Sequence, residues 1–185
     1  DDVLGVPTLY IGITGNLETN FNKLDIFFDY DAGNGQNQLR GDNPDVDFNG
    51  LNRMGDDGTG NGLLFDSDFT ANAFFGVTNG AYDCDLDLAE IYANYADLDN
   101  QIGRYLGQGT NGFGTLSGGD NPDGIQATTD NSNIDGVTDN DTTGSDLVTT
   151  GFEFAIPLTA FGEPTQDIRM IAFVNSNGHD FLSNQ

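Results

Sequence analysis

The chain has 185 residues, which suits a single domain with a substantial core. Its 30 acidic residues against five Lys and Arg give a formal net charge of −25, which excludes the basic patches that nucleic-acid binding requires. Fourteen Phe and six Tyr exclude intrinsic disorder, because disordered chains are poor in aromatic residues. No apolar run reaches the length of a membrane-spanning helix.

Alternating apolar residues predict β-strands along the whole chain, and no segment shows a sustained helical period. The first strand is typical, because Leu9, Ile11 and Ile13 share one face of it. We also expect short helical turns at 67–72 and 157–161. The predicted strands, in chain order, are 9–14, 23–29, 73–78, 86–95, 103–106, 124–129, 151–156 and 168–174.

The strand spacing predicts the fold class. Short strands separated by loops rich in Gly, Asn and Asp are typical of antiparallel all-β proteins. We therefore expect one all-β domain over 1–185, an antiparallel β-sandwich or jelly roll with long acidic loops and at most short helical turns. Because the chain opens at Asp1 without a signal peptide, we interpret it as a processed or trimmed part of a longer secreted protein.

Two segments, 31–62 and 130–146, are predicted as long polar loops. Structureless loops of this length are uncommon in compact domains unless they are functional or disordered. Both contain closely spaced acids, so a metal ion could supply the order that packing does not. The pentapeptide Gly-Asp-Asn-Pro-Asp occurs at 41–45 and again at 119–123. This repeat fits either a reused turn or a pair of cation sites.

The acidic residues point to calcium. All but four of them are Asp, which favours loops, and loops dense in short oxygen ligands suit hard cations. Bound divalent ions would also relieve the self-repulsion of so large a charge. None of the clusters is an EF-hand, and a merely soluble acidic surface is the alternative. The predicted calcium ligands are Asp29, Asp31, Asp42, Asp45, Asp47, Asp83, Asp85, Asp87, Asp135, Asp139 and Asp141.

Enzymatic chemistry finds little support in the sequence. His179 is the single histidine and Cys84 the single cysteine, which excludes His-rich zinc sites, thiolate clusters and an internal disulfide. We interpret His179 as structural. A glycosidase needs two placed carboxylates, but among 30 acids such a pair always exists and carries no information. We therefore expect no enzyme.

Carbohydrate binding is the alternative function. Sugars stack on exposed aromatic rings, and β-sandwiches often bind them, yet the chain has no Trp. A Tyr-lined exposed concavity would support this alternative. We interpret most of the tyrosines as packing residues, because they lie in strand patterns: Tyr10, Tyr30, Tyr82, Tyr92, Tyr95 and Tyr105.

Several segments resemble known families. Glu153-Phe154-Ala155-Ile156-Pro157 resembles the E-x-A-I-P strand of the family-nine carbohydrate-binding-module and DOMON-like sandwiches, and segments 9–13 and 24–29 are similar to their paired opening strands. Segments 15–18, 47–54 and 178–185 resemble a group of secreted bacterial surface proteins, which often carry a C-terminal sorting signal and have no established activity. The resemblance implies a jelly-roll-like sandwich and export. The missing Trp departs from the tryptophan clamp of the sugar-binding members.

Together these observations predict a non-catalytic structural or adhesive module on the outside of the cell, stabilised by calcium. We expect it to associate with copies of itself, as a subunit of a fibre or surface layer, or with a surface polymer. A glycan is the alternative partner.

Overall fold

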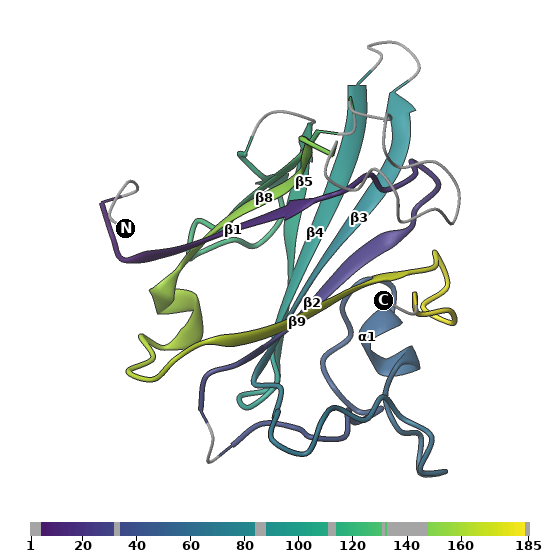
Figure 1. Cartoon of the computed structure of the whole chain (residues 1–185), viewed down its shortest axis with the longest axis vertical. Helices are drawn as coiled ribbons and strands as arrows, with labels where there is room; N and C mark the ends of the chain where they lie inside the picture. Colours follow the sequence, from purple (N-terminus) through teal and green to yellow (C-terminus); the bar gives the residue numbers. More distant parts are fainter. Residues whose placement is uncertain are drawn as a thin grey trace.

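The computed structural model describes residues 5–31, 34–83, 88–110, 114–130, 132 and 148–183, and only the backbone of 81–83 and 88–90. Two antiparallel sheets pack face to face (Figure 1). The larger has the strand order β6-β5-β4-β3-β2-β9 and the smaller β1-β8-β7. The predicted all-β sandwich is therefore confirmed. The strands are β1 (Thr8–Thr14), β2 (Lys23–Asp29), β3 (Ala73–Asp83), β4 (Leu88–Asp97), β5 (Ile102–Thr110), β6 (Ser117–Gly118), β7 (Gln126–Thr129), β8 (Gly151–Pro157) and β9 (Arg169–Asn175).

The helical turns follow the sequence only in part. The turn predicted at 157–161 is confirmed as the 3-10 helix η2 (Leu158–Phe161). At 67–72 there is a single hydrogen-bonded turn, closed by the amide of Phe69 donating to the carbonyl of Asp66, and the chain then forms an isolated β-bridge from Ala71 to Gln36 instead of a helix. The α-helix α1 (Gly50–Arg53) instead lies within the predicted irregular loop. No helix of the described residues is long and apolar enough to cross a membrane.

The main core lies between the two sheets. It is built by the alternation that the sequence shows, so Leu24, Ile26 and Phe28 point inward from β2 and are almost fully buried. Across the interface the rings of Phe75 and Phe154 meet edge to face, with centroids 5.2 Å apart. Packing of this kind fixes the smaller sheet over the larger one.

A second core covers part of the outer face of the larger sheet. Phe27 points away from the main core and is fully buried against Phe65 and Phe74, with ring centroids 5.0 and 5.2 Å away. Leu39 and Leu51, from the loop predicted to lack packing, are also fully buried in this cluster. Apolar packing therefore orders the described part of this loop, where the sequence suggested that a metal ion could supply the order.

Candidate binding cleft

Beside the second core, the same outer sheet face opens into a cleft of about 780 Å³. Its floor is formed by adjacent cross-strand neighbours, since Thr78 on β3 lies between Lys23 on β2 and Tyr92 on β4. Loop segments 45–48 and 177–179 form the walls. The lining residues are Phe21, Lys23, Asp45, Val46, Asp47, Phe48, Arg53, Thr78, Tyr92, Asn94, Tyr105, Asn177 and His179.

Exposed aromatic rings distinguish this cleft. Phe48 is 92% exposed, Phe21 41% and Tyr105 40%, although aromatic side chains of this size are normally used to fill a core. In the same cleft, the buried Asn94 lies beside Tyr105, its pairing partner on β5. Rings next to hydrogen-bonding groups suit a ligand that has both an apolar face and hydroxyl or amide groups.

Backbone strain supports a functional role for the wall. Asp47, Phe48 and Asn49 have φ values of 51°, 55° and 66°, so three successive residues other than Gly are left-handed. Asn and Asp tolerate this conformation, whereas a bulky residue such as Phe rarely adopts it. Strain of this kind costs about 1–3 kcal/mol per residue and concentrates at functional sites. Here it holds Phe48 out in solvent at the mouth of the cleft.

A buried charged cluster anchors the strained turn. The Lys23 ammonium lies 3.1 Å from Asp47 Oδ2 and donates a hydrogen bond of 2.9 Å to Thr78 Oγ1. The His179 ring nitrogen Nε2 lies 3.0 Å from the same Asp47 oxygen. All of these side chains are at least nine-tenths buried. The ring of His179 fits only because position 50 is Gly, since a Cβ there would lie 2.0 Å from His179 Cε1.

The cluster holds two carboxylates in opposite electrostatic environments. Burial alone would raise the pKa of Asp47, but the close approach of His179 and the charge of Lys23 outweigh it, and the pKa is lowered. Burial raises the pKa of Asp25 to about 6, against the lowering effects of His179 and of the hydrogen bond from Asn175. Asp47 is thus a fixed anion, whereas Asp25 changes charge near pH 6.

The predicted calcium ligands between Asp29 and Asp47 do not converge on one site. Asp29 is buried and paired with Arg169, and Asp42 lies 2.9 Å from the guanidinium Nε of Arg40. Asp31 accepts a hydrogen bond from Asn34.

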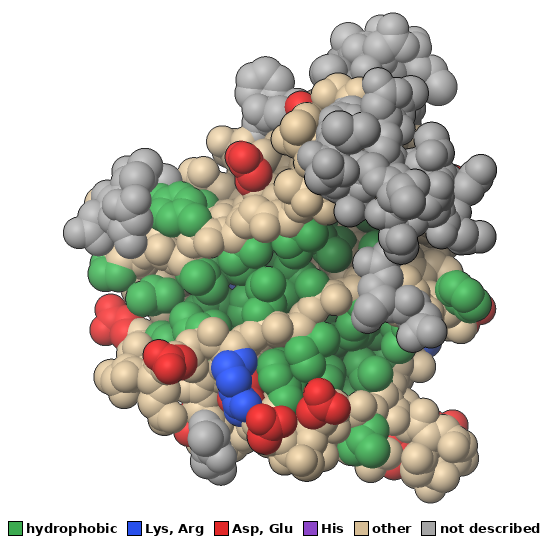
Figure 2. Space-filling view, in the orientation of Figure 1, with side chains coloured by type: hydrophobic (Ala, Val, Ile, Leu, Met, Phe, Trp, Pro, Cys, Tyr) green, Lys and Arg blue, Asp and Glu red, His purple; other side chains and the backbone are tan. Residues whose placement is uncertain are grey.

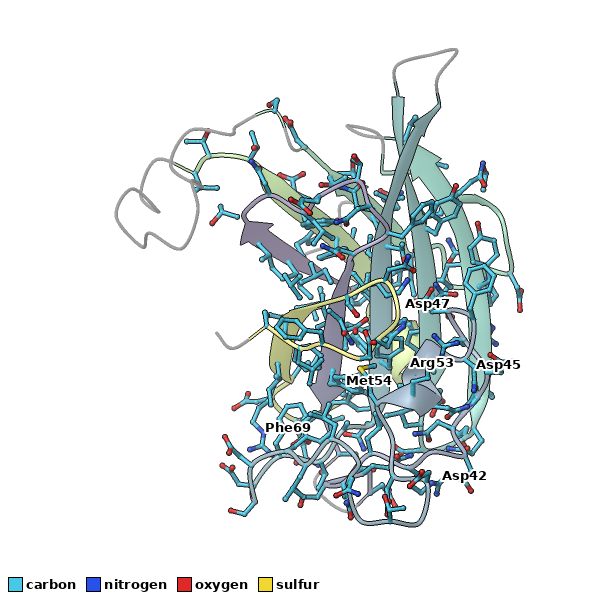
Figure 3. All side chains as sticks on the ribbon, turned by 90° about the vertical axis from the view of Figure 1, so that its right-hand side faces the viewer. Asp42, Asp45, Asp47, Arg53, Met54 and Phe69 are labelled. Carbon is cyan, nitrogen blue, oxygen red and sulfur yellow. The ribbon has the colours of Figure 1, made fainter. Side chains whose placement is uncertain are left out.

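Within the same loop, Asp42, Asp45 and Asp47 are spread along the chain rather than gathered (Figure 3). Of this set, Asp45 and Asp47 line the cleft, and Asp47 is neutralised by Lys23. Within the described residues, no three His, Cys, Asp or Glu side chains form a group that could hold a metal ion.

The remaining predicted ligands are not placed. For Asp83 only the backbone is described, at the end of β3. The others lie outside the described residues: Asp85, Asp87, Asp135, Asp139 and Asp141.

The two Gly-Asp-Asn-Pro-Asp pentapeptides serve as turns. Asn43 donates to the carbonyl of Arg40, and Asn121 bonds both backbone groups of Ile125. Their aspartates pair with different arginines, because Asp120 lies 3.3 Å from Arg104 whereas Asp42 pairs with Arg40. This bonding supports the reused turn over a shared cation site.

Sequence reasoning missed the aromatic part of the cleft. The interpretation of the tyrosines as packing residues holds for Tyr95, which is 2% exposed, but is wrong for Tyr105 and Tyr10, which are 40% and 44% exposed. The sequence did contain a sign that Phe48 is exposed. It stands between Asp47 and Asn49 in a polar loop, where no predicted strand or helix would bury an aromatic side chain. His179 was expected to be structural, and its buried contact with Asp47 fits that role.

Comparison with known proteins adds no assignment. No protein-family model, no curated protein and no solved structure matches the chain. The interpretation of the cleft therefore rests on its own geometry, and the resemblance to carbohydrate-binding and surface proteins stays a prediction.

Proposed function

We propose that the chain is a non-catalytic, extracellular adhesive module that binds carbohydrate in this cleft. The observation that carries the proposal is the set of exposed rings of Phe21, Phe48 and Tyr105 around a polar floor. A pyranose presents C–H groups on its faces and hydroxyls around its edge, so it needs aromatic surface and hydrogen-bonding groups in one place. The tyrosine-lined concavity that would favour a glycan ligand is thus present.

The polar groups of the cleft suit sugar hydroxyls. Arg53 and Asn177 are exposed on the walls, where their side chains can donate hydrogen bonds, and Asp45 can accept them. A volume of about 780 Å³ lies within the usual range for a small-molecule site and accommodates a short oligosaccharide. The strained turn that presents Phe48 would keep this ring in place before the ligand arrives, which lowers the entropic cost of binding.

The charged floor supports binding without catalysis. Hydrolysis of a glycosidic bond uses one carboxylic acid with a raised pKa and a second carboxylate across the bond. Asp47 has a lowered pKa and is paired with Lys23 and His179, so it fits the role of an anchor for the turn. Asp25, whose pKa is raised, is completely buried and does not line the cleft.

A glycan array with matched variants tests the proposal. Tyr105→Ala and Phe48→Ala should each weaken binding of the best array ligand by about tenfold or more. Loss of one aromatic stack costs about 1–3 kcal/mol for a nucleic-acid base, and we expect a comparable loss for a sugar ring. Tyr10→Ala is the control, since Tyr10 is equally exposed but lies on the smaller sheet, outside the cleft. An array without ligands, or equal losses in all three variants, would contradict the proposal.

A further inference from the structure

A second, apolar surface lies on the edge of the sandwich. Figure 2 shows hydrophobic side chains gathered between β1 and β9, where neither strand covers them. Leu9, Ile11 and Ile13 of β1 face this surface and are only partly buried against the main core. We call it the β1–β9 groove and define it by Leu9, Ile11 and Ile13 of β1 together with Ile168, Met170 and Val174 in and beside β9.

The groove exists because the two sheets differ in width. With neighbouring strands about 4.8 Å apart, six strands span about 24 Å between their outer axes and three strands about 10 Å. The smaller sheet is placed toward β4 and β5, which β7 contacts. The inward face of β9 is therefore left uncovered. Val174 and Ile168 pack against the main core, and alternation places Met170, 42% exposed, on the same face.

The β1 side of the groove is an open hydrogen-bonding edge. The amide of Gly15 donates to Thr150, and the carbonyl of Pro7 accepts from Leu158, so odd-numbered residues of β1 turn their backbone groups toward β8. Tyr10 and Gly12 consequently direct theirs toward the groove. In the part of the chain that the structure describes, no strand pairs with β1 on that side.

The edge of β9 is already engaged at its far end. Leu182 forms a bridge with Asn175, and the amide of Ser183 donates to Val174. Among the described residues, no strand or bridge occupies the edge of β1 opposite β8, and this edge stands directly beside exposed apolar surface. A row of backbone donors and acceptors at strand spacing is matched only by another polypeptide strand.

We propose that the β1–β9 groove binds an extended peptide segment, which adds to the smaller sheet as a fourth strand beside β1. Alternate side chains of this segment point into the groove and are apolar, because Leu9, Ile11 and Ile13 face them. The side chains between them face solvent and are neutral or basic, because the chain carries a net charge of −25. This surface is separate from the cleft, which lies on the outer face of the larger sheet.

A second folded copy fits the groove poorly. If two copies paired through β1 around a twofold axis, both larger sheets would lie on the same side, and their β9 strands would meet in the groove. Two chains of charge −25 also repel each other at short range. The shape and the charge of the molecule both favour a lone strand.

A synthetic peptide tests the proposal directly. The probe has about nine residues, with Val at alternate positions, Thr between them and Lys at both ends, and the control is a scrambled peptide of the same composition. We expect only the probe to bind, as measured by fluorescence anisotropy, and to slow amide hydrogen exchange at Tyr10 and Gly12. N-methylation of the probe on the edge that faces β1 should weaken binding by about tenfold or more, and methylation of the other edge should not.

Matched variants of β1 locate the binding surface. Ile11 points into the groove and Tyr10 points out of it, so Ile11→Thr should weaken probe binding by about tenfold, and Tyr10→Thr should leave it unchanged. Urea unfolding of both variants verifies that they are folded. Equal binding of the scrambled peptide, or equal effects of N-methylation on both edges, would overturn the proposal. Concentration-dependent dimers that exclude the probe would overturn it in favour of a second copy.

Discussion

The two halves of the outer face of the larger sheet differ sharply. In one half, the cross-strand row formed by Phe27, Phe74 and Ala96 is fully buried beneath the loop that contains α1. In the other half, the row formed by Lys23, Thr78 and Tyr92 is the floor of an open cleft. The same three strands thus pack against the loop with one row of side chains and form the floor of the cleft with another.

The boundary between the halves shows why the cover stops where it does. Asp47 begins the left-handed segment that precedes α1 in the covering loop, and Lys23 and His179 hold it there. Apolar packing accounts for the closed half, whereas buried charge and backbone strain define the open half. Both features of the open half cost free energy that a purely structural surface would not need, which supports the proposal that this half binds a ligand.

The largest effect is expected from the closed half. Phe27→Ala should lower the free energy of unfolding by about 3–5 kcal/mol, because it opens a cavity among Phe65, Phe74 and their neighbours. The matched change Phe48→Ala, in the exposed ring of the open half, should alter stability by less than about 0.5 kcal/mol. Urea unfolding measures both. Similar losses in the two variants would erase the distinction between the halves.

At the boundary, Asp47→Asn should destabilise by about 3–5 kcal/mol, because it leaves the buried ammonium of Lys23 without its anion. Asp45→Asn, two residues earlier on the exposed rim, is the control and should have little effect. Chemical denaturation at neutral pH compares them. If the two variants were equally stable, the charged cluster would not anchor the turn.

Asp25 makes the stability of the fold at this boundary depend on pH. Its folded pKa of about 6 exceeds the ordinary value of 3.8, so its contribution to stability is fully present below pH 3.8 and is lost as the pH rises through 6. Asp47 titrates the other way, but its lowered pKa places its effect below pH 3.8.

Asp25→Asn removes this titration from the cluster. The free energy of unfolding of Asp25→Asn, relative to that of the unmodified chain, should therefore rise by up to about 3 kcal/mol between pH 4 and pH 7. Urea unfolding across this range checks it, with Asp45→Asn as the control. A constant difference between Asp25→Asn and the unmodified chain would show that Asp25 does not titrate in this window.

Calcium is expected to have the smallest effect on the two halves, because their described residues include no group of carboxylates that could hold an ion. The predicted ligands that remain are Asp83, Asp85, Asp87, Asp135, Asp139 and Asp141. If the free calcium concentration is about 100 times the dissociation constant, removal of calcium should lower the free energy of unfolding by about 2.7 kcal/mol. Thermal melting in excess chelator, starting from protein shown to contain the metal, measures it. An unchanged melting temperature would remove the calcium prediction.

The sequence predicted those strands that show a local alternation of apolar and polar residues. β1, with Leu9, Ile11 and Ile13 on one face, was predictable because one face of the strand packs against the core and the other meets solvent. β2 was predicted as a strand, but its burial on both faces was not, because the partners of Phe27 come from a loop without any period.

The site depended on pairings that no local pattern reveals. Asp47 was singled out for its charge, yet its partners are Lys23 on β2 and His179 near the other end of the chain. Once Lys23 and His179 approach the carboxylate, their contacts with Asp47 replace the metal site that clustered aspartates suggest. The tyrosines posed the same difficulty, since alternation shows that Tyr105 and Leu106 face opposite ways but not which side is covered.

Mapping of the bound sugar by nuclear magnetic resonance tests the central claim most directly. On titration with the best array ligand, we predict saturable shifts of the side-chain amides of Asn94 and Asn177 and of the backbone amide of Tyr105, all of which line the cleft. The amides of Tyr10 and Thr14 on β1 should stay in place. Saturable shifts confined to β1, or none in the cleft while the ligand binds, would contradict the account.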